Sequence, residues 1–144
     1  MKQILAFISV ILLAGTIWYY RVHPLTPTLR VAGHTFTIEL ALTSAEKEKG
    51  LGFRDVLPQD RGMLFVFDHK DRYPFWMKGM RFPLDILWID DTTVVDVSEN
   101  VPVATVGVYP SYQPIKPVNK VLEVNAGVVK RFGISIGDTV EILD

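Results

Sequence analysis

Three apolar runs organise this chain: Gly62-Met-Leu-Phe-Val-Phe67, Pro74-Phe-Trp-Met-Lys-Gly79 and Pro83-Leu-Asp-Ile-Leu-Trp-Ile-Asp90. Each has the length of a β-strand and is bounded by charged residues, proline or glycine. Lys78 and Asp85 stand within them at positions where a buried strand carries apolar side chains. Strand alternation puts Asp85 on one face with Leu87 and Ile89, so we expect a buried carboxylate that requires a partner.

The sequence on either side of these runs is also mostly β. Strands are predicted at residues 29–42 (a hairpin), 63–67, 73–78, 84–90, 94–97, 118–124 and 139–142. Short helices are predicted at Ser44–Gly50, with Thr43 or Ser44 as its cap, and at Ala126–Phe132. The predicted fold class is α+β and mostly β: a compact antiparallel sheet, barrel-like or sandwich-like, with two short helices.

Composition narrows the classes of function. The chain has 144 residues, enough for one domain with a core, and a formal net charge of -1. A nearly neutral chain gives no electrostatic argument for binding nucleic acid, and none is predicted as a partner. The absence of cysteine excludes disulfides, a thiolate nucleophile and a cysteine zinc site. No cofactor and no dedicated metal site are predicted.

The N-terminus is expected to meet a membrane. Residues 4–20 carry no charge, and Trp18 and the tyrosines after it resemble an interfacial belt. We expect a transmembrane anchor at residues 1–22, a proline-stiffened linker at 23–27 and one globular domain at 28–144, placed outside the cytoplasm. A signal peptide cleaved after the small residues at 14–16 is the alternative.

Blocks of sequence in a fixed order carry a family resemblance. They are Gly50-Leu-Gly-Phe-Arg54, Leu57-Pro58, Gly62–Phe67, Phe75-Trp-Met-Lys78, Pro83-Leu-Asp-Ile86, Ile89-Asp90, Val121-Leu-Glu-Val-Asn-Ala-Gly127 and Gly137-Asp138. Over residues 28–144 the chain resembles the domain of unknown function 192 family. The resemblance implies a compact, mostly β domain, often behind a prokaryotic signal or anchor, without an established activity. Two departures are Gly52, where the family usually has Met, and Thr92-Thr93, where its turn usually has Gly.

A candidate polar cluster comprises Arg54, Lys78, Asp85, Glu123 and Asn125. Glu123, like Asp85, stands on an otherwise apolar strand face. We expect Asp85 to pair with Lys78 or Arg54, and Glu123 and Asn125 to bind backbone or side-chain donors of the same region. Arg54 alternatively clamps its loop through carboxylates or carbonyls, a task that suits its forked side chain.

The expected function is a membrane-anchored binding or accessory module that takes a protein or small-molecule ligand, rather than an enzyme. Trp76, Tyr109 and Tyr112, with the proline-rich residues 99–117, form the candidate recognition surface.

Two alternatives stay open. One is a hydrolase-like enzyme that uses Asp85, Glu123 and Lys78 as acid, base and charge stabiliser. The other is binding of a soft metal such as Cu(I) by Met63, Met77, Met80 and His69, because thioethers suit that ion.

The anchor prediction can be tested by cell fractionation. Full-length protein should stay with the membrane pellet after carbonate extraction, because residues 4–20 form an uncharged run about 25 Å long as a helix. Release of the full-length chain into the soluble fraction would contradict the prediction. A shorter, soluble form would instead support the cleaved signal peptide.

Overall fold

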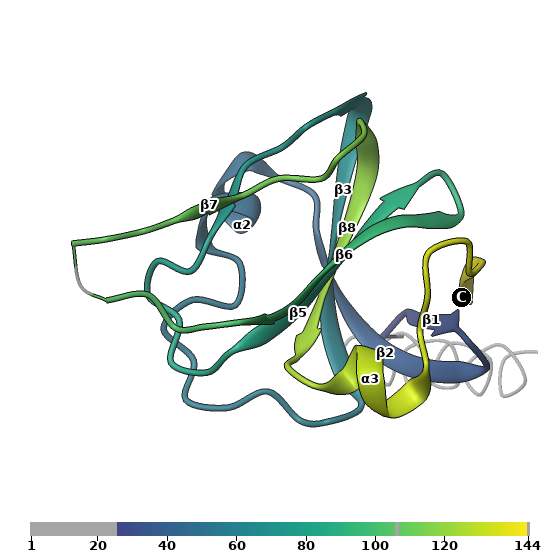
Figure 1. Cartoon of the computed structure of the whole chain (residues 1–144), viewed down its shortest axis with the longest axis horizontal. Coiled ribbons are helices and arrows are strands. Elements are labelled where there is room, and N and C mark those ends of the chain that lie inside the picture. The colour runs from purple at the N-terminus through teal and green to yellow at the C-terminus, as the bar shows by residue number, and fades with distance from the viewer. Residues whose placement is uncertain (1–25, 106, 144) are drawn as a thin grey trace, which may run out of the picture.

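A mixed seven-stranded sheet forms the body of the protein (Figure 1). The computed structural model describes residues 26–105 and 107–143. The elements are β1 (Thr28–Val31), β2 (His34–Ala41), α2 (Ser44–Lys49), β3 (Arg61–Asp71), β4 (Phe75–Trp76), β5 (Leu84–Asp90), β6 (Thr93–Val101), β7 (Ser111–Tyr112), β8 (Val118–Asn125), α3 (Val128–Phe132) and β9 (Val140–Leu143). The large sheet has the order β6-β5-β8-β3-β2-β1-β9, and β4 pairs with β7 in a second, two-stranded sheet.

The large sheet curls into a half-barrel. Its edge strands β6 and β9 meet through a bridge between Thr93 and Thr139. Nearby, the N–H of Val94 donates to the carbonyl of Asp138 at 3.0 Å, and the N–H of Gly137 donates to the carbonyl of Val94 at 2.8 Å. These bonds satisfy backbone groups that an open edge would expose. The barrel-like alternative is therefore the one that describes this sheet.

One strand pair departs from the predicted antiparallel sheet. β2 and β3 run parallel, with Ile38 opposite Gly62 and Leu40 opposite Leu64. Parallel neighbours cannot be joined by a tight turn and require a crossover. Residues 42–60, which include α2, form that crossover. Apolar periodicity locates strands but does not fix the direction in which they pair, so the sequence prediction was wrong on this point.

The two faces of the sheet pack against different layers. One face carries Leu122 and Val124 in a core cluster with α3. The other carries Val121, with Trp88 and Phe65 from the neighbouring strands, in a second cluster. The crossover and residues 73–82 supply Leu51, Leu57, Phe75, Met77 and Met80 to this second cluster.

Several local predictions are confirmed. The hairpin at residues 29–42 and the strand at 84–90 are present. α2 has a capping box: the Thr43 hydroxyl accepts from the Glu46 N–H at 3.3 Å, and the Glu46 carboxylate accepts from the Thr43 N–H at 2.8 Å.

The predicted strand at 73–78 is reduced to Phe75–Trp76. Gly79, with a φ of 74°, lies in a turn that the N–H of Met80 closes on the carbonyl of Met77 at 3.2 Å. The strand predicted at 63–67 is longer than expected, because β3 extends to Asp71. Lys70 on that extension contacts Asp90 and Asp91.

Asp85 is fully buried, and its predicted ion pair with Lys78 or Arg54 is wrong. One carboxylate oxygen accepts from the backbone N–H of Asn100 at 2.8 Å, and the other accepts from that of Val129 at 2.9 Å. Val129 lies in the first turn of α3, whose N-cap, Gly127, supplies no side-chain hydrogen bond. Asp85 therefore caps this helix from β5. The free N–H groups at the start of a helix attract a carboxylate, so they can take the place of a cationic partner.

The residues before Thr26 are outside the described part of the chain, so the predicted anchor at 1–22 and its signal-peptide alternative are not placed. Within residues 26–105 and 107–143, no helix has the length and apolar character needed to cross a bilayer.

Replacing Asp85 by Asn should lower the free energy of unfolding by about 2–3 kcal/mol, since an amide cannot accept from both N–H groups without turning a donor toward one of them. Urea denaturation of the full-length protein measures this change. Asp55→Asn is the control, because Asp55 makes only an exposed ion pair with Arg81. Equal stability of the Asp85 and Asp55 variants would exclude the capping role.

Candidate functional site

Glu123 lies in the middle of the sheet and is the starting point of the candidate site. It is on β8, opposite Met63 of β3 and Ile86 of β5. Because alternate strand residues share a face, Glu123 points with Val121 toward the second core cluster. Its side chain is 5% exposed, and its Oε2 atom has no hydrogen-bond partner among the described residues.

Burial changes the protonation of this carboxyl group. Removal from water disfavours the charged form and raises the pKa of Glu123 to about 8. Glu123 is therefore mostly a neutral carboxylic acid at neutral pH. In that form it offers one O–H donor as well as acceptor oxygens.

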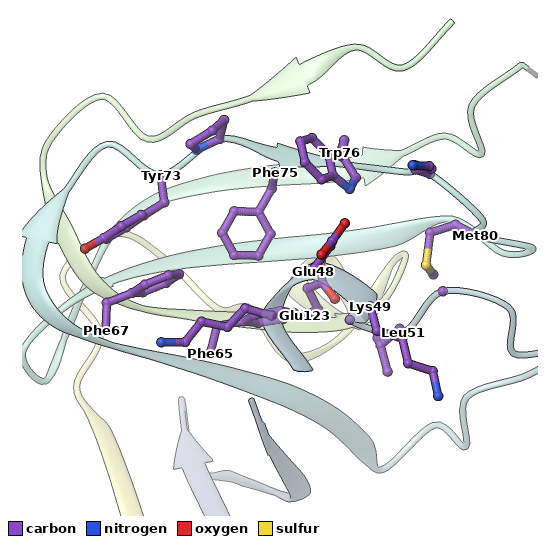
Figure 2. A pocket seen from close by; sticks show the side chains of 15 residues that line it. Glu48, Lys49, Leu51, Phe65, Phe67, Tyr73, Phe75, Trp76, Met80 and Glu123 are labelled. Carbon is purple, nitrogen blue, oxygen red and sulfur yellow. The ribbon is translucent and has the colours of Figure 1, made fainter. Parts of the chain in front are cut away.

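The carboxyl group adjoins a pocket of about 210 Å³ (Figure 2). Its apolar walls are Leu51, Phe65, Phe67, Tyr73, Pro74, Phe75, Trp76 and Met80. In Figure 2, Tyr73, Phe75 and Trp76 line one side, and Phe67, Phe65 and Leu51 line the opposite side. The charged lining residues besides Glu123 are Lys47, Glu48, Lys49 and Lys78.

The aromatic walls are fixed by contacts among their rings. Phe67 and Tyr73 stack with ring centroids 3.6 Å apart. Phe75 meets Phe65 edge to face at 4.9 Å and meets the buried Trp88 in the same way at 5.3 Å. Such contacts hold the rings beyond what their burial alone does. The pocket is thus a preformed apolar site with one embedded acid, a combination typical of small-molecule sites.

Glycines let the crossover approach the sheet closely. Gly50 has a φ of 49°, and a Cβ there would lie 3.3 Å from the ring of Phe65 and 3.8 Å from Oε2 of Glu123. At Gly52 a Cβ would lie 2.9 Å from the carbonyl oxygen of Lys49 and 3.3 Å from that of Lys78. A side chain at either position would require the pocket wall to move.

The family assignment is now supported by comparison. The model of the DUF192 family, described as "Uncharacterized ACR", matches residues 27–142. The chain belongs to this family. No curated protein matches it.

Solved structures similar to this DUF192 chain include the following two. One, from Sinorhizobium meliloti 1021, is described as a candidate transcription regulator. It is 38% identical, with a TM-score of 0.72, and the match covers 81% of this chain and 93% of that one. The other is a protein of unknown function from Novosphingobium aromaticivorans DSM 12444. It is 36% identical, with a TM-score of 0.72, and the match covers 83% of this chain and 89% of the other.

The structure divides the predicted polar cluster of this DUF192 domain. Lys78 lines the same pocket as Glu123. Asp85 faces the opposite side of the sheet, because it is paired with Val124 while Glu123 is paired with Ile86. The enzyme alternative that joined Asp85 to Glu123 in one site is therefore wrong in its geometry.

The other two members of the cluster are structural. Arg54 clamps Glu39 with two hydrogen bonds of 2.6 and 2.8 Å, as the loop-clamp alternative predicted. This contact lowers the pKa of Glu39. Asn125 donates to the carbonyls of Leu57 and Pro58 at 2.9 and 3.2 Å, which fastens the crossover to β8. Asn125 was expected to bind donors, but its amide nitrogen is itself the donor.

The three aromatic residues of the predicted recognition surface also lie in different places. Trp76 is 47% exposed and lines the pocket. Tyr112, half-buried on β7, packs against the second core cluster. Tyr109 is exposed but does not line the pocket at Glu123.

The methionines proposed for soft-metal binding are all buried in the second core cluster. Of these, Met80 also lines the pocket. His69 lies in the exposed end of β3. This placement makes the three thioethers part of the core packing, a common use of methionine.

Nothing in the sequence marked Phe65, Phe67, Tyr73 and Gly50 as pocket residues. The aromatic residues resemble ordinary core residues, and only the crossover brings Gly50 over them. Glu123 was detectable because a carboxylate interrupts an apolar strand.

The raised pKa of Glu123 predicts a pH dependence of stability. In the unfolded chain the Glu123 carboxyl has its ordinary pKa of 4.5 and releases its proton above that pH, whereas the native state keeps the proton. The stabilisation from the neutral acid is therefore complete below about pH 4.5 and is lost as the pH rises to about 8, by up to about 1.4 kcal/mol per pH unit. Glu123→Gln should remove this decline in the free energy of unfolding, measured by urea denaturation at several pH values.

Glu99→Gln provides the control for this measurement, since Glu99 is an exposed residue of β6. This variant should follow the wild-type pH profile. A Glu123→Gln profile parallel to that of the wild type would show that Glu123 titrates as in the unfolded chain.

Proposed function

We propose that this protein is a binding module for a small organic ligand with an apolar body, held in the pocket beside Glu123. The observation that carries the proposal is the Oε2 atom of Glu123 at the pocket, which has no hydrogen-bond partner in the described part of the chain. Buried polar atoms are nearly always hydrogen-bonded, so an exception in a pocket calls for a specific explanation. A ligand that exchanges hydrogen bonds with the neutral acid provides one.

The size and chemistry of the pocket support a ligand with one or two rings. A dry cavity of about 150 Å³ is large enough to bind benzene, and this pocket is about 210 Å³. Its aromatic walls favour a flat apolar group. The hydrogen bond to Glu123 would fix the orientation of that group, since a few polar atoms in an apolar site provide specificity.

Binding is favoured over the hydrolysis that would pair Asp85 with Glu123. A hydrolytic pair needs two carboxyl groups at one bond, whereas Asp85 and Glu123 lie on opposite faces of the sheet. The Sinorhizobium protein is described as a candidate transcription regulator. A formal net charge of -1 adds no electrostatic support for extending a DNA-binding role to this chain.

The proposal includes attachment to a membrane through residues 4–20, with the domain outside the cytoplasm. The uncharged N-terminal run supports this attachment. A tethered binding module would present its pocket to small molecules at the cell envelope.

Methionine methyl groups provide a local test of binding. Met80 lines the pocket, whereas Met63 and Met77 are buried in the same core cluster without lining it. Neutral one- and two-ring fragments, titrated into full-length protein with carbon-13-labelled methionine methyl groups, should shift the NMR signal of Met80 most. Fragments that shift none of the three signals, or all three equally, would argue against the pocket.

Glu123 variants separate hydrogen bonding from shape. Glu123→Gln keeps a donor and an acceptor and should retain the fragments that carry hydrogen-bonding groups. Glu123→Leu should weaken them by up to about tenfold, the factor expected for one lost hydrogen bond. Purely hydrocarbon fragments are the control, because they should bind the leucine variant at least as well as the wild type.

A further inference from the structure

A second hollow adjoins the pocket at Glu123. This hollow, of about 280 Å³, is lined by Ala45, Glu48, Lys49, Phe53, Trp76 and Lys78. Four of these residues, Glu48, Lys49, Trp76 and Lys78, also line the pocket at Glu123. The two hollows therefore adjoin at these four side chains, and we call them together the groove. Its inner end is at Glu123, and its open end is at Phe53.

Charge is distributed unevenly along the groove. The inner end holds a mostly neutral acid. The rim shared by the two hollows carries Lys49 and Lys78 against one acid, Glu48. Within the described residues, the salt bridges involve other cations, so neither lysine of the rim is neutralised by an ion pair. The rim thus has an excess of positive charge next to an apolar interior.

Phe53 is held at the open end in a strained conformation. Its φ is 66°, in the left-handed region that bulky residues rarely adopt. Its N–H donates to the carbonyl of Gly79 at 2.7 Å, and a Cβ on Gly79 would lie 2.9 Å from the Phe53 ring. Despite these constraints, the side chain remains 66% exposed.

Burial of the Phe53 ring does not offset its backbone strain. Strain of this kind gathers at ligand sites, and here an exposed aromatic ring is fixed at the end of a groove. Trp76, 47% exposed, lines the same hollow (Figure 2 shows it above Glu48). The open end therefore offers two aromatic surfaces beside two lysines that make no salt bridge with another described residue.

We infer that the ligand of this groove is an amphipathic carboxylic acid in its anionic form. Its apolar body occupies the pocket beside Glu123, and its carboxylate meets the ammonium groups of Lys49 and Lys78 at the rim. This inference rests on the proposed binding function and adds the charge and polarity of the ligand. It follows from charge complementarity: the inner end accepts an uncharged group at Glu123, and the rim carries excess positive charge. Lys47, the other lysine that lines the pocket, lies over the ring of Phe67.

Three small molecules that share one apolar body test the inference. They are 3-phenylpropanoate, 3-phenylpropanamide and 3-phenylpropan-1-amine, which are anionic, neutral and cationic near neutral pH. Isothermal titration calorimetry with the full-length protein should give the tightest binding for the acid, roughly tenfold tighter than for the amide, and the weakest for the amine. The advantage of the acid should shrink as salt is added.

Substitution of the rim lysines locates the effect. The double variant Lys49→Gln/Lys78→Gln should bind the acid and the amide equally, because both residues are exposed and their replacement leaves the apolar pocket intact. Lys116→Gln, which changes an exposed lysine outside the groove, should keep the preference for the acid.

The outcomes distinguish this inference from the function on which it rests. If the amide or the amine binds as tightly as the acid, the pocket binds ligands but the anionic class is wrong. The same conclusion follows if the preference for the acid survives the double substitution. If none of the three compounds binds and the Met80 signal does not respond to any fragment, the binding function itself is overturned.

Discussion

The parallel pairing of β2 with β3 determines where the pocket lies. Because parallel neighbours need a crossover, the chain between Ala41 and Arg61 must pass over one face of the sheet. That crossover brings α2 and the glycines at 50 and 52 over the face that bears Glu123. An antiparallel hairpin at the same place would remove this part of the cover and leave only residues such as Phe75 and Met80 from the segment 73–82. The burial of Glu123, and with it the raised pKa, thus depends in part on the direction of one strand pair.

The two buried carboxyl groups of the sheet, those of Asp85 and Glu123, have different environments. Asp85 receives a backbone N–H on each oxygen, so its charge is balanced by hydrogen bonds and by the start of α3. Glu123 lies among aromatic rings, and its Oε2 atom has no hydrogen-bond partner among the described residues. Its charge is instead removed by protonation. The first arrangement fixes a helix. The second leaves hydrogen-bonding capacity for a ligand.

Features that depend on residues close together in the sequence could be predicted. The strand at 84–90, the hairpin turn and the Thr43–Glu46 capping box follow from alternation and local hydrogen bonding. The two acids were recognised because they interrupt apolar faces. Their surroundings depend on contacts between distant segments, and the partners of Asp85 are 15 and 44 residues away in the chain.

The dependence on distant segments also explains why the predicted ion pair of Asp85 was wrong. Cations can be counted in a sequence, so Lys78 and Arg54 were the evident partners. A free backbone N–H at a helix start can serve equally well, but nothing in the residue types marks which helix will lie beside which strand. Phe53 is a similar case, because its ring lies where a Cβ at position 79 would be, and Gly79 lies beside it only in the folded chain.

The pairing of β1 with β9 has a consequence for how the protein can be attached to other structures. Thr28 lies opposite Leu143, so the two ends of the described chain leave the fold at the same place. α2, which lines the pocket, is on the opposite side from the C-terminus in Figure 1. A surface that binds the protein near Thr28 or Leu143 would therefore leave the groove turned outward. Reporter groups attached at these two residues would sit close enough for energy transfer between them without obstructing the groove.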